Sequence, residues 1–541
     1  MSYPSVLCEC PVRRAERGVT VRVRLSSRFQ EHSVVLLSIA LYSLSLSLQM
    51  FGAALVCVSV SCSLSKMPQV PEVQLFAAYF PQWHQTPLND YWFGPNFTDW
   101  ALLCNRVRAH GGINRLGRKT LLPLPPPNGL GWYDLNDQRI RRRQALLARE
   151  YGIHGFAYYH FWFTRPAAWG ANLDDALNVN GTRYGADMDE TLLKLLDEHD
   201  GEPNLPFYFV WANEAFVWKW VWPHGRVSML RPGATQVPQN YERPGWEPHF
   251  RYLLRFFMHQ NYHKVDGKPV FAIYEANQKS RDAQAALDEM MHLFQVWAVD
   301  AGLAGLHLLQ FHHHAGGLSN PNAVDRTSKL RPWANGVQDF GRHWRQHPSG
   351  NHATQYTLQP KPAWLPAHVP WHPGLIVDFD NTPRKGIQRA NIMNQSDSFK
   401  PRLDAALTMA LRGRNRTAQP SPAMVFIVAW NEWSEGCTLE PSSDRQFEHL
   451  QTVRAVLSRH GQYRRKLGCG SNAASGASRL AGLATDVHKS TVDLQLQWTD
   501  CACGDALSSR AATANSSTYR PYFCGTVFPH IATELEQQHC A

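Results

Sequence analysis

The sequence lacks the cysteine pattern of a zinc site. Nine of its 11 cysteines lie before residue 63 or after residue 468, and none forms a CxxC pair with a second pair at zinc-finger distance. The central body therefore offers neither a structural zinc site nor a dense disulfide framework. The five cysteines after residue 468 could pair only in an oxidising compartment.

Glycine-rich phosphate-binding loops are also missing where a nucleotide-binding fold needs one. The first predicted strand runs directly into the segment 81–84, PQWH, without a glycine. This disfavours an open, doubly wound sheet. The run His312, His313 and His314 is no better as a metal site, because consecutive residues of a strand point in alternating directions. We therefore predict no metal ion and no cofactor.

Basic residues outnumber acidic ones, with a formal net charge of +10, but they are dispersed. The densest groups are 139–143, which opens a predicted helix, and 412–416 in a polar segment. No groove-reading motif or stacking platform accompanies either group. We expect both on the solvated surface and predict no nucleic-acid partner.

Charge is absent from Ser33 to Ser65, after an arginine-rich start. This stretch exceeds the ~20 residues that a membrane span requires, and the preceding arginines would keep the N-terminus in the cytoplasm. We expect a single span at about 34–63 and a type II or lumenal protein of the secretory pathway. The alternatives are a cleaved signal, or a leader outside the working protein, with a cytoplasmic protein that starts at Met67.

The central part alternates short apolar runs with helical patterns, which is typical of βα units around a parallel sheet. We predict three parts: a leader at 1–66, a (β/α)8 barrel with long βα loops at 67–464, and a mostly disordered tail at 465–541. The eight predicted strands are 74–79, 154–160, 206–211, 269–274, 306–311, a short one near Val324, 375–379 and 424–430. The clearest predicted helices are 138–151, 189–199, 248–260, 282–301, 399–411 and 445–459.

Polar and aromatic side chains follow most of these strands, and in a βα barrel the active site forms at the carboxyl ends of the strands. Burying so many polar groups is costly unless they are paired, which favours a functional origin. We predict a substrate-binding role for Tyr79, Trp83, His84, Tyr158, Tyr159, His160, Trp162, Trp211, Asn213, Glu214, Tyr274, Asp380, Asn381, Arg384, Trp430 and Asn431.

Glu432 and Glu435 are the predicted catalytic pair. They lie three positions apart on a turn that leaves the last strand, so both carboxyl groups can face one pocket and couple electrostatically. Two flanking carboxylates are the usual requirement for cleaving a glycosidic bond. The plainer alternative for either residue is a helix cap or an ion pair with a nearby arginine, and for Glu214 it is a structural ion pair.

Six segments carry a family resemblance: AAYFPQWH, YGIHGFAYYHFWF, LPFYFVWANE, VDGKPVFAIY, FDNTPRKG and AWNEWSEGCTLEP. They resemble the motifs of WbsX-type proteins, which are similar to glycoside hydrolase family 99, and the resemblance runs from Leu75 to Leu450. It implies a (β/α)8 barrel that acts on an oligo- or polysaccharide. Family 99 enzymes are retaining endo-α-mannosidases with a motif that NEWSEG matches.

By that resemblance Glu432 draws the proton from the sugar 2-hydroxyl, whose oxygen attacks the anomeric carbon to give a 1,2-anhydro intermediate. Glu435 protonates the leaving oxygen and then activates water. Two alternatives stay open. One is a glycosyltransferase of polysaccharide synthesis, for which the string Asp378-Phe-Asp380 resembles a DxD motif. The other is a catalytically silent glycan-binding barrel.

Overall fold

The computed structural model describes residues 7–12, 19–24, 73–109, 111–166, 177–179, 182–196, 205–217, 235–312, 329–341, 344–346, 353–356, 358–388, 390–393, 399–414 and 423–463. The chain divides into two compact units, Met1–Gln69 and Val70–Ala541. In the first unit, β1 (Leu7–Val12) and β2 (Val19–Arg24) form an antiparallel hairpin. The predicted span at 34–63 and the predicted tail at 465–541 lie outside the described residues. Among the residues that the structure describes, no helix is long and apolar enough to cross a membrane.

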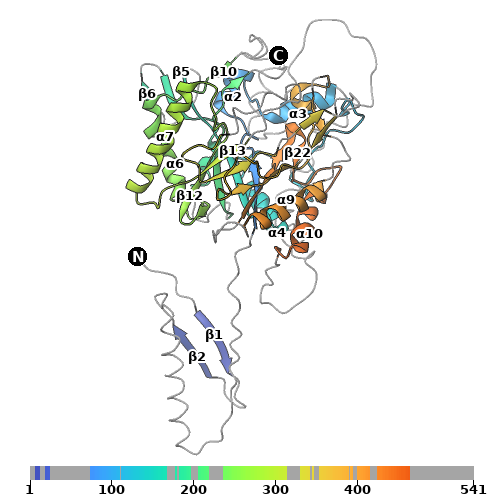
Figure 1. The fold of residues 1–541 in the computed structure, drawn as a ribbon. Coiled ribbons are helices and arrows are strands. Elements are labelled where there is room, and N and C mark those ends of the chain that lie inside the picture. The colour runs from blue at the N-terminus through green and yellow to red at the C-terminus, as the bar shows by residue number, and fades with distance from the viewer. Residues whose placement is uncertain are drawn as a thin grey trace, which may run out of the picture. The chain divides into compact units, whose positions relative to one another are not determined.

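The second unit is a (β/α)8 barrel, as predicted (Figure 1). Its seventh strand is split at Pro373 into two short pieces: β17 pairs with β14 on one side, and β18 pairs with β20 on the other. This split strand closes the parallel sheet. In sheet order the strands are β17 (Trp371–His372), β14 (Gly336–Asp339), β13 (His307–His312), β12 (Lys268–Ile273), β8 (Phe207–Trp211), β4 (Gly155–His160), β3 (Val73–Tyr79), β20 (Ala423–Val428) and β18 (Gly374–Ile376).

These strands are apolar along nearly their whole length because both faces are covered. All residues of β3, β4 and β8 are buried. A parallel strand inside a barrel packs side chains inward and against the outer helices, so it has no solvent face. Gly155 is required where β4 passes β8, because a Cβ there would lie 2.2 Å from the carbonyl oxygen of Pro206.

The predicted strands agree with the barrel except for the sixth and the seventh. The predicted short strand near Val324 lies outside the described residues, and β14 takes the sixth position. The seventh strand lies at 371–376, before the predicted 375–379. The segment Trp371–Ile376 contains Pro373 and Gly374, two residues that weaken any strand pattern in a sequence.

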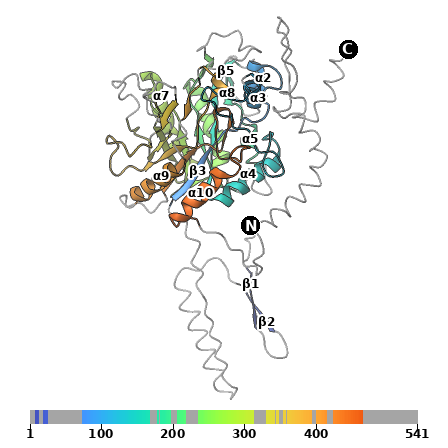
Figure 2. The ribbon, with the colours of Figure 1, turned by 90° about the vertical axis from the view of Figure 1, so that its right-hand side faces the viewer.

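Helices cover the outside of the barrel, and Figure 2 shows α4, α9 and α10 beside β3. The helix α4 begins after Asp137, whose side chain accepts the backbone N–H of Arg139, and ends at Gly152 in a left-handed conformation. The long outer helices are α4 (Gln138–Tyr151), α6 (Trp246–Phe257), α7 (Arg281–Asp300), α9 (Phe399–Arg414) and α10 (Glu448–Arg459). The predicted helix 189–199 is described only to residue 196, and its helical part is α5 (Glu190–Leu193).

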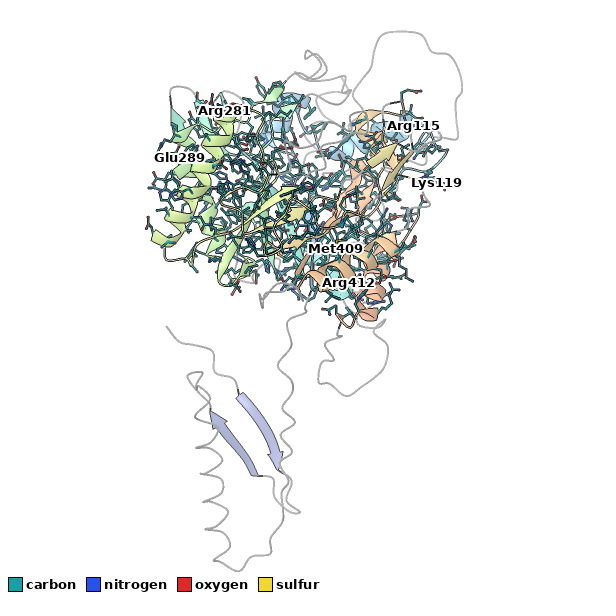
Figure 3. The ribbon with its side chains drawn as sticks, viewed as in Figure 1. Arg115, Lys119, Arg281, Glu289, Met409 and Arg412 are labelled. Atoms are coloured by element: carbon teal, nitrogen blue, oxygen red, sulfur yellow. The ribbon has the colours of Figure 1, made fainter. Side chains whose placement is uncertain are left out.

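One arginine departs from the prediction that the basic groups lie on the solvated surface. Arg412 is exposed, as predicted, although it belongs to the last turns of α9 (Figure 3) and not to a loop. Arg141 is buried, and its guanidinium donates to the carbonyl oxygen of Leu135 at 2.6 Å. That hydrogen bond fixes the segment before α4, so Arg141 is part of the fold and not of a charged surface.

Short elements gather at the carboxyl ends of the strands, where α2, α3 and α8 lie together in Figure 2. They include helices α2 (Pro87–Phe93), α3 (Asp99–Ala109) and α8 (Thr382–Lys385). Small sheets join them: β5 (Trp162–Pro166) with β6 (Leu177–Val179) and β7 (Thr182–Ala186), β9 (Phe216–Val217) with β10 (Thr235–Val237), and β15 (Trp344–Gln346) with β16 (Ala353–Tyr356) and β19 (Ile392–Met393). The remaining pieces are η2 (Arg243–Gly245), β11 (Lys264–Val265), β21 (Asn431–Glu432), η3 (Trp433–Glu435) and β22 (Cys437–Thr438).

Candidate functional site

A tight hairpin after β20 carries the two predicted catalytic glutamates. β21 pairs with β22, with Glu432 opposite Cys437, and the turn between them is the 3-10 helix η3. Gly436 closes the turn at φ 59°, in the left-handed region that favours glycine. A Cβ on Gly436 would also lie 3.1 Å from the backbone of Asp380. The glycine therefore lets the hairpin sit directly against the chain that follows the seventh strand.

Arg384 of α8 binds both glutamates. Its Nη1 lies 3.0 Å from Glu435 Oε1 and its Nη2 lies 3.2 Å from Glu432 Oε2. Both glutamates are almost fully buried, at 4% and 7% exposure. A buried carboxylate is very unfavourable without an opposite charge and hydrogen bonds. The guanidinium supplies both, and it draws the two carboxyl groups to one point.

Asp99, at the start of α3, is a third carboxylate in this cluster. It is 2% exposed, and its Oδ1 lies 3.7 Å from Arg384 Nη2. Burial raises the pKa of Asp99 to about 6, with Glu435 adding to the rise and Arg384 opposing it. Asp99 therefore ionises near neutral pH, in a pocket that already holds two carboxyl groups.

Glu440 lies beneath the hairpin and supports it. Its carboxyl group accepts hydrogen bonds from Tyr133 Oη at 2.8 Å, from Gln144 Nε2 at 2.7 Å and from Trp433 Nε1 at 2.7 Å. Burial raises the pKa of Glu440 to about 7, although these donors lower it. Because Trp433 stands between the two predicted catalytic glutamates in the chain, Glu440 anchors the centre of the turn.

The glutamates open into a pocket of about 380 Å³ at the carboxyl ends of the strands. Much of its wall is aromatic, with phenylalanines from five different segments, whereas Arg384 and the carboxyl groups occupy one side. Aromatic faces with a few placed polar groups suit a ligand that has both apolar faces and hydroxyl groups. The aromatic side chains of the wall are Phe80, Trp92, Phe93, Phe97, Tyr159, Phe161, Phe216, Tyr274, Phe340 and Phe379.

Seven of the predicted site residues line this pocket. They come from strand ends that are far apart in the sequence, because the barrel brings all the strand ends together. The seven are Tyr159, Glu214, Tyr274, Asn381, Arg384, Glu432 and Glu435.

Four predicted binding residues point away from the pocket, toward the outer helices of the barrel. Tyr79 Oη donates to Gln144 of α4 at 2.7 Å, and Tyr158 packs against Tyr79. His160 and Trp211 both contact His249 of α6. Successive side chains of a strand alternate between the two faces, so the neighbours of an inward residue face outward.

Six further predicted residues do not line the pocket but support the segments around it. Asn431 bridges the backbone of Phe80, accepting from its N–H at 2.8 Å and donating to its carbonyl oxygen at 3.0 Å. Trp83 donates to the carbonyl oxygen of Asn431 at 2.8 Å. Trp430 is fully buried. The other contacts are His84 with Glu190, Trp162 stacked on His249, and Asn213 with Tyr241 and Glu275.

Asp380 lines a second pocket, of about 360 Å³, which Gly436 of the hairpin also lines. Its carboxyl group accepts from Asn114 Nδ2 at 2.7 Å and from the backbone N–H of Thr382 at 3.0 Å. Asp378 lines the same pocket and pairs with Arg445 at 3.0 Å. Lys119, which lies at the edge of the second unit in Figure 3, is a further charged group there, as are Arg118 and Asp444. The two aspartates of the DxD-like string thus share one face.

Sequence reasoning missed Asp99 and the aromatic residues of α2 and of the segment before α3. The predicted site residues lie at strand ends, whereas these residues lie well beyond the end of β3, in the long first βα loop. The segment Trp92-Phe93 through Trp100 is nevertheless rich in aromatics and includes an acidic residue, Asp99, which was a usable signal. Among the described residues, no three His, Cys, Asp or Glu side chains gather as a metal site would require.

The chain is similar to one protein family and to two curated proteins. The chain matches the family described as Glycosyltransferase WbsX over residues 75–180 and 188–453. It is 25% identical over 421 residues to the "Uncharacterized protein WxcX" of Xanthomonas campestris pv. campestris strain B100, covering 74% of this chain. A second strain, ATCC 33913, has a relative that is 26% identical over 414 residues. The chain spans about half the length of these curated relatives, 52% and 51%.

Two solved structures are also similar to this chain, each at 12% identity. One is the GH99 endo-alpha-mannosidase from Bacteroides thetaiotaomicron, with a TM-score of 0.38 and coverage of 73% of this chain and 98% of that one. The other is described as a glycoside hydrolase-like protein, with a TM-score of 0.40 and coverage of 71% and 93%.

Proposed function

The chain belongs to the WbsX family, whose members are expected to act on glycans, and from this premise we propose that it is a retaining glycoside hydrolase. Its substrate is an α-mannoside-like linkage within a larger glycan. The observation that carries the proposal is the convergence of Glu432 and Glu435 on one guanidinium at the wall of one pocket. Glycoside hydrolysis needs such a pair of carboxyl groups beside the scissile bond.

In the proposed reaction, Glu432 takes the proton of the sugar 2-hydroxyl. The oxygen attacks the anomeric carbon, and the bond to the leaving oxygen breaks as Glu435 gives that oxygen a proton. Glu435 then takes a proton from water, which opens the 1,2-anhydro ring, and the 2-oxygen recovers its proton from Glu432. Two inversions at one carbon retain the configuration. The support for these roles is the match of NEWSEG to the motif of family 99.

The charges around the pocket favour a neutral sugar over a phosphate-bearing donor. Four carboxyl groups line it, from Asp99, Glu214, Glu432 and Glu435, against two cationic residues, Arg384 and Lys385. Arg384 is already engaged by two of the carboxyl groups. A diphosphate would meet like charges, whereas sugar hydroxyls can donate hydrogen bonds to carboxylates.

A glycosyltransferase is the second candidate, and the family description favours it. The second pocket holds Asp378 and Asp380 together with Arg118, Lys119 and Arg445, so it offers cations for a phosphate. Of the hairpin, only Gly436 is among its lining residues, whereas Glu432 and Glu435 line the first pocket. A transfer reaction would need the acceptor and the donor sugar to meet in one pocket.

The test is product analysis by NMR. The full chain is incubated with a panel of α-mannosides and bacterial polysaccharides, with and without nucleotide sugars. We expect a sugar released with retained anomeric configuration and without any nucleotide requirement. Glu432→Gln and Glu435→Gln should each lower the rate by about 10²–10⁴-fold, whereas Glu247→Gln on the exposed face of α6 should not.

Three results would contradict the proposal. Turnover that depends on a nucleotide sugar would make the protein a transferase. Hydrolysis that survives both glutamine substitutions would place the chemistry elsewhere, and an inverted product would remove the 1,2-anhydro route.

A further inference from the structure

Asp99 lines the pocket, and one of its carboxyl oxygens is buried without a hydrogen-bond partner among the described residues. Its Oδ1 accepts no hydrogen bond from the described residues, and the nearest cation, Arg384 Nη2, is 3.7 Å away, beyond hydrogen-bonding distance. An unsatisfied buried carboxylate oxygen is strongly unfavourable. Such an oxygen at the wall of a pocket indicates that its partner is a ligand.

The position of Asp99 is fixed by its neighbours. Trp100 donates from Nε1 to the carbonyl oxygen of Tyr133 at 2.7 Å, and its ring packs against Trp83 at a centroid distance of 3.9 Å. The helix α3 that begins at Asp99 packs against α8 and η3, which carry Arg384 and Glu435. The carboxyl group is therefore held in place beside the glutamate pair, as a binding group must be.

Arg384 is directed at the glutamates, and its Nη2 is too far from Asp99 Oδ1, at 3.7 Å, for a hydrogen bond. Its Nη1 and Nη2 already bind Glu435 and Glu432 at 3.0 and 3.2 Å. The remaining demand of Asp99 is for a neutral hydrogen-bond donor that enters the pocket. A sugar hydroxyl is such a donor, and it adds no charge to a pocket that is already rich in carboxylates.

We infer that Asp99 is a further substrate-binding residue, whose Oδ1 accepts a hydrogen bond from one hydroxyl of the sugar ring held against Glu432 and Glu435. This inference rests on the proposed function, because it takes the ligand to be a mannose-configured sugar. It adds a contact from the first βα loop, on the side of the pocket formed by α3. Asp99 then helps to select a sugar that carries a hydroxyl at that one position.

The experiment is a binding comparison that needs no turnover. Dissociation constants of methyl α-D-mannopyranoside and its 2-, 3-, 4- and 6-deoxy analogues are measured by saturation-transfer NMR. The proteins are the full wild-type chain, Asp99→Ala and Asp99→Asn, with the exposed Asp282→Ala of α7 as the matched control. Thermal unfolding of each variant shows that it is folded.

We expect Asp99→Ala to weaken the parent glycoside about ten- to hundredfold, as the loss of a charge-assisted hydrogen bond does. One deoxy analogue should bind the wild type weakly and should lose nothing more in Asp99→Ala. Asp99→Asn keeps an acceptor oxygen and should recover part of the affinity, and Asp282→Ala should match the wild type.

Equal weakening of all five glycosides in Asp99→Ala would show that Asp99 acts only through Arg384 or the fold, and unchanged affinities would show that it makes no contact. Either result overturns the inference and leaves the proposed hydrolase intact. If the wild type binds none of the five, the mannose-configured substrate is wrong, and the assignment of Asp99 falls with it.

Discussion

Glu440 is a carboxyl group that gains a proton by folding. Its pKa of about 7 lies above its ordinary value, so the folded protein holds an extra proton between about pH 4.5 and 7. This contribution to stability is complete at low pH and is lost as the pH rises through 7. Glu440→Gln lacks this pH-dependent contribution. The amide nitrogen of the new glutamine also meets hydrogen-bond donors where the carboxyl group had acceptors, which lowers the free energy of unfolding by about 1–3 kcal/mol at every pH.

We therefore expect Glu440→Gln to be less stable than the wild type at pH 5, with a difference that narrows by up to about 3 kcal/mol at pH 8. Urea unfolding at both pH values measures this. A difference that does not change with pH would mean that Glu440 is ionised throughout the range.

At the scale of single elements, the β21–β22 hairpin depends on Gly436. Gly436→Ala places a Cβ on a residue in the left-handed region, which costs about 1–2 kcal/mol of stability. The new Cβ also lies 3.1 Å from Asp380. The hairpin must move, and Glu435 moves with it. We expect the hydrolytic rate to fall at least about tenfold, since small displacements of catalytic groups are costly.

The matched control is Gly461→Ala after α10. Gly461 has a similar φ of 68°, but a Cβ there meets no atom within 4 Å. Both variants should lose similar stability from the backbone, whereas only Gly436→Ala should lose activity. Equal activities in the two variants would show that the hairpin tolerates the shift.

At the scale of the whole molecule, buried histidines make the barrel sensitive to acid. Burial lowers the pKa of His154 and His307 to about 4, and that of His160, His263 and His372 to about 3. The unfolded chain takes up these protons near pH 6.5, but the folded chain does not. Stability is therefore complete above pH 6.5 and is lost as the pH falls toward 3.

Three buried carboxyl groups act in the opposite direction, because the pKa is raised in Asp99, Asp189 and Glu440. The histidines are more numerous, so we expect a net loss of stability from pH 7 to 4.5. His263→Phe should reduce that loss by about 3 kcal/mol, because one buried imidazole no longer resists protonation. Unfolding curves at the two pH values decide this, and an unchanged pH dependence would contradict it.

Much of the barrel could be predicted from the sequence, because buried parallel strands are apolar on both faces and their helices repeat every three to four residues. The boundaries of α4, Gln138–Tyr151, were predicted as the structure has them. The split seventh strand was placed too late, because its pairing on both sides depends on closure of the sheet. A strand that contains Pro373 and Gly374 has no local pattern of its own.

The sequence by itself determined the candidate catalytic pair, because NEWSEG places Glu432 and Glu435 three residues apart after the last strand. It determined the family as well, since both follow from the order of side chains along the chain. The tertiary structure decided which strand-end residues reach the pocket, because alternation sends Tyr159 inward and Tyr158 and His160 outward. It also decided the place of Asp99, because only the packing of α3 against α8 and η3 brings a residue so far from the hairpin in sequence to the side of Arg384.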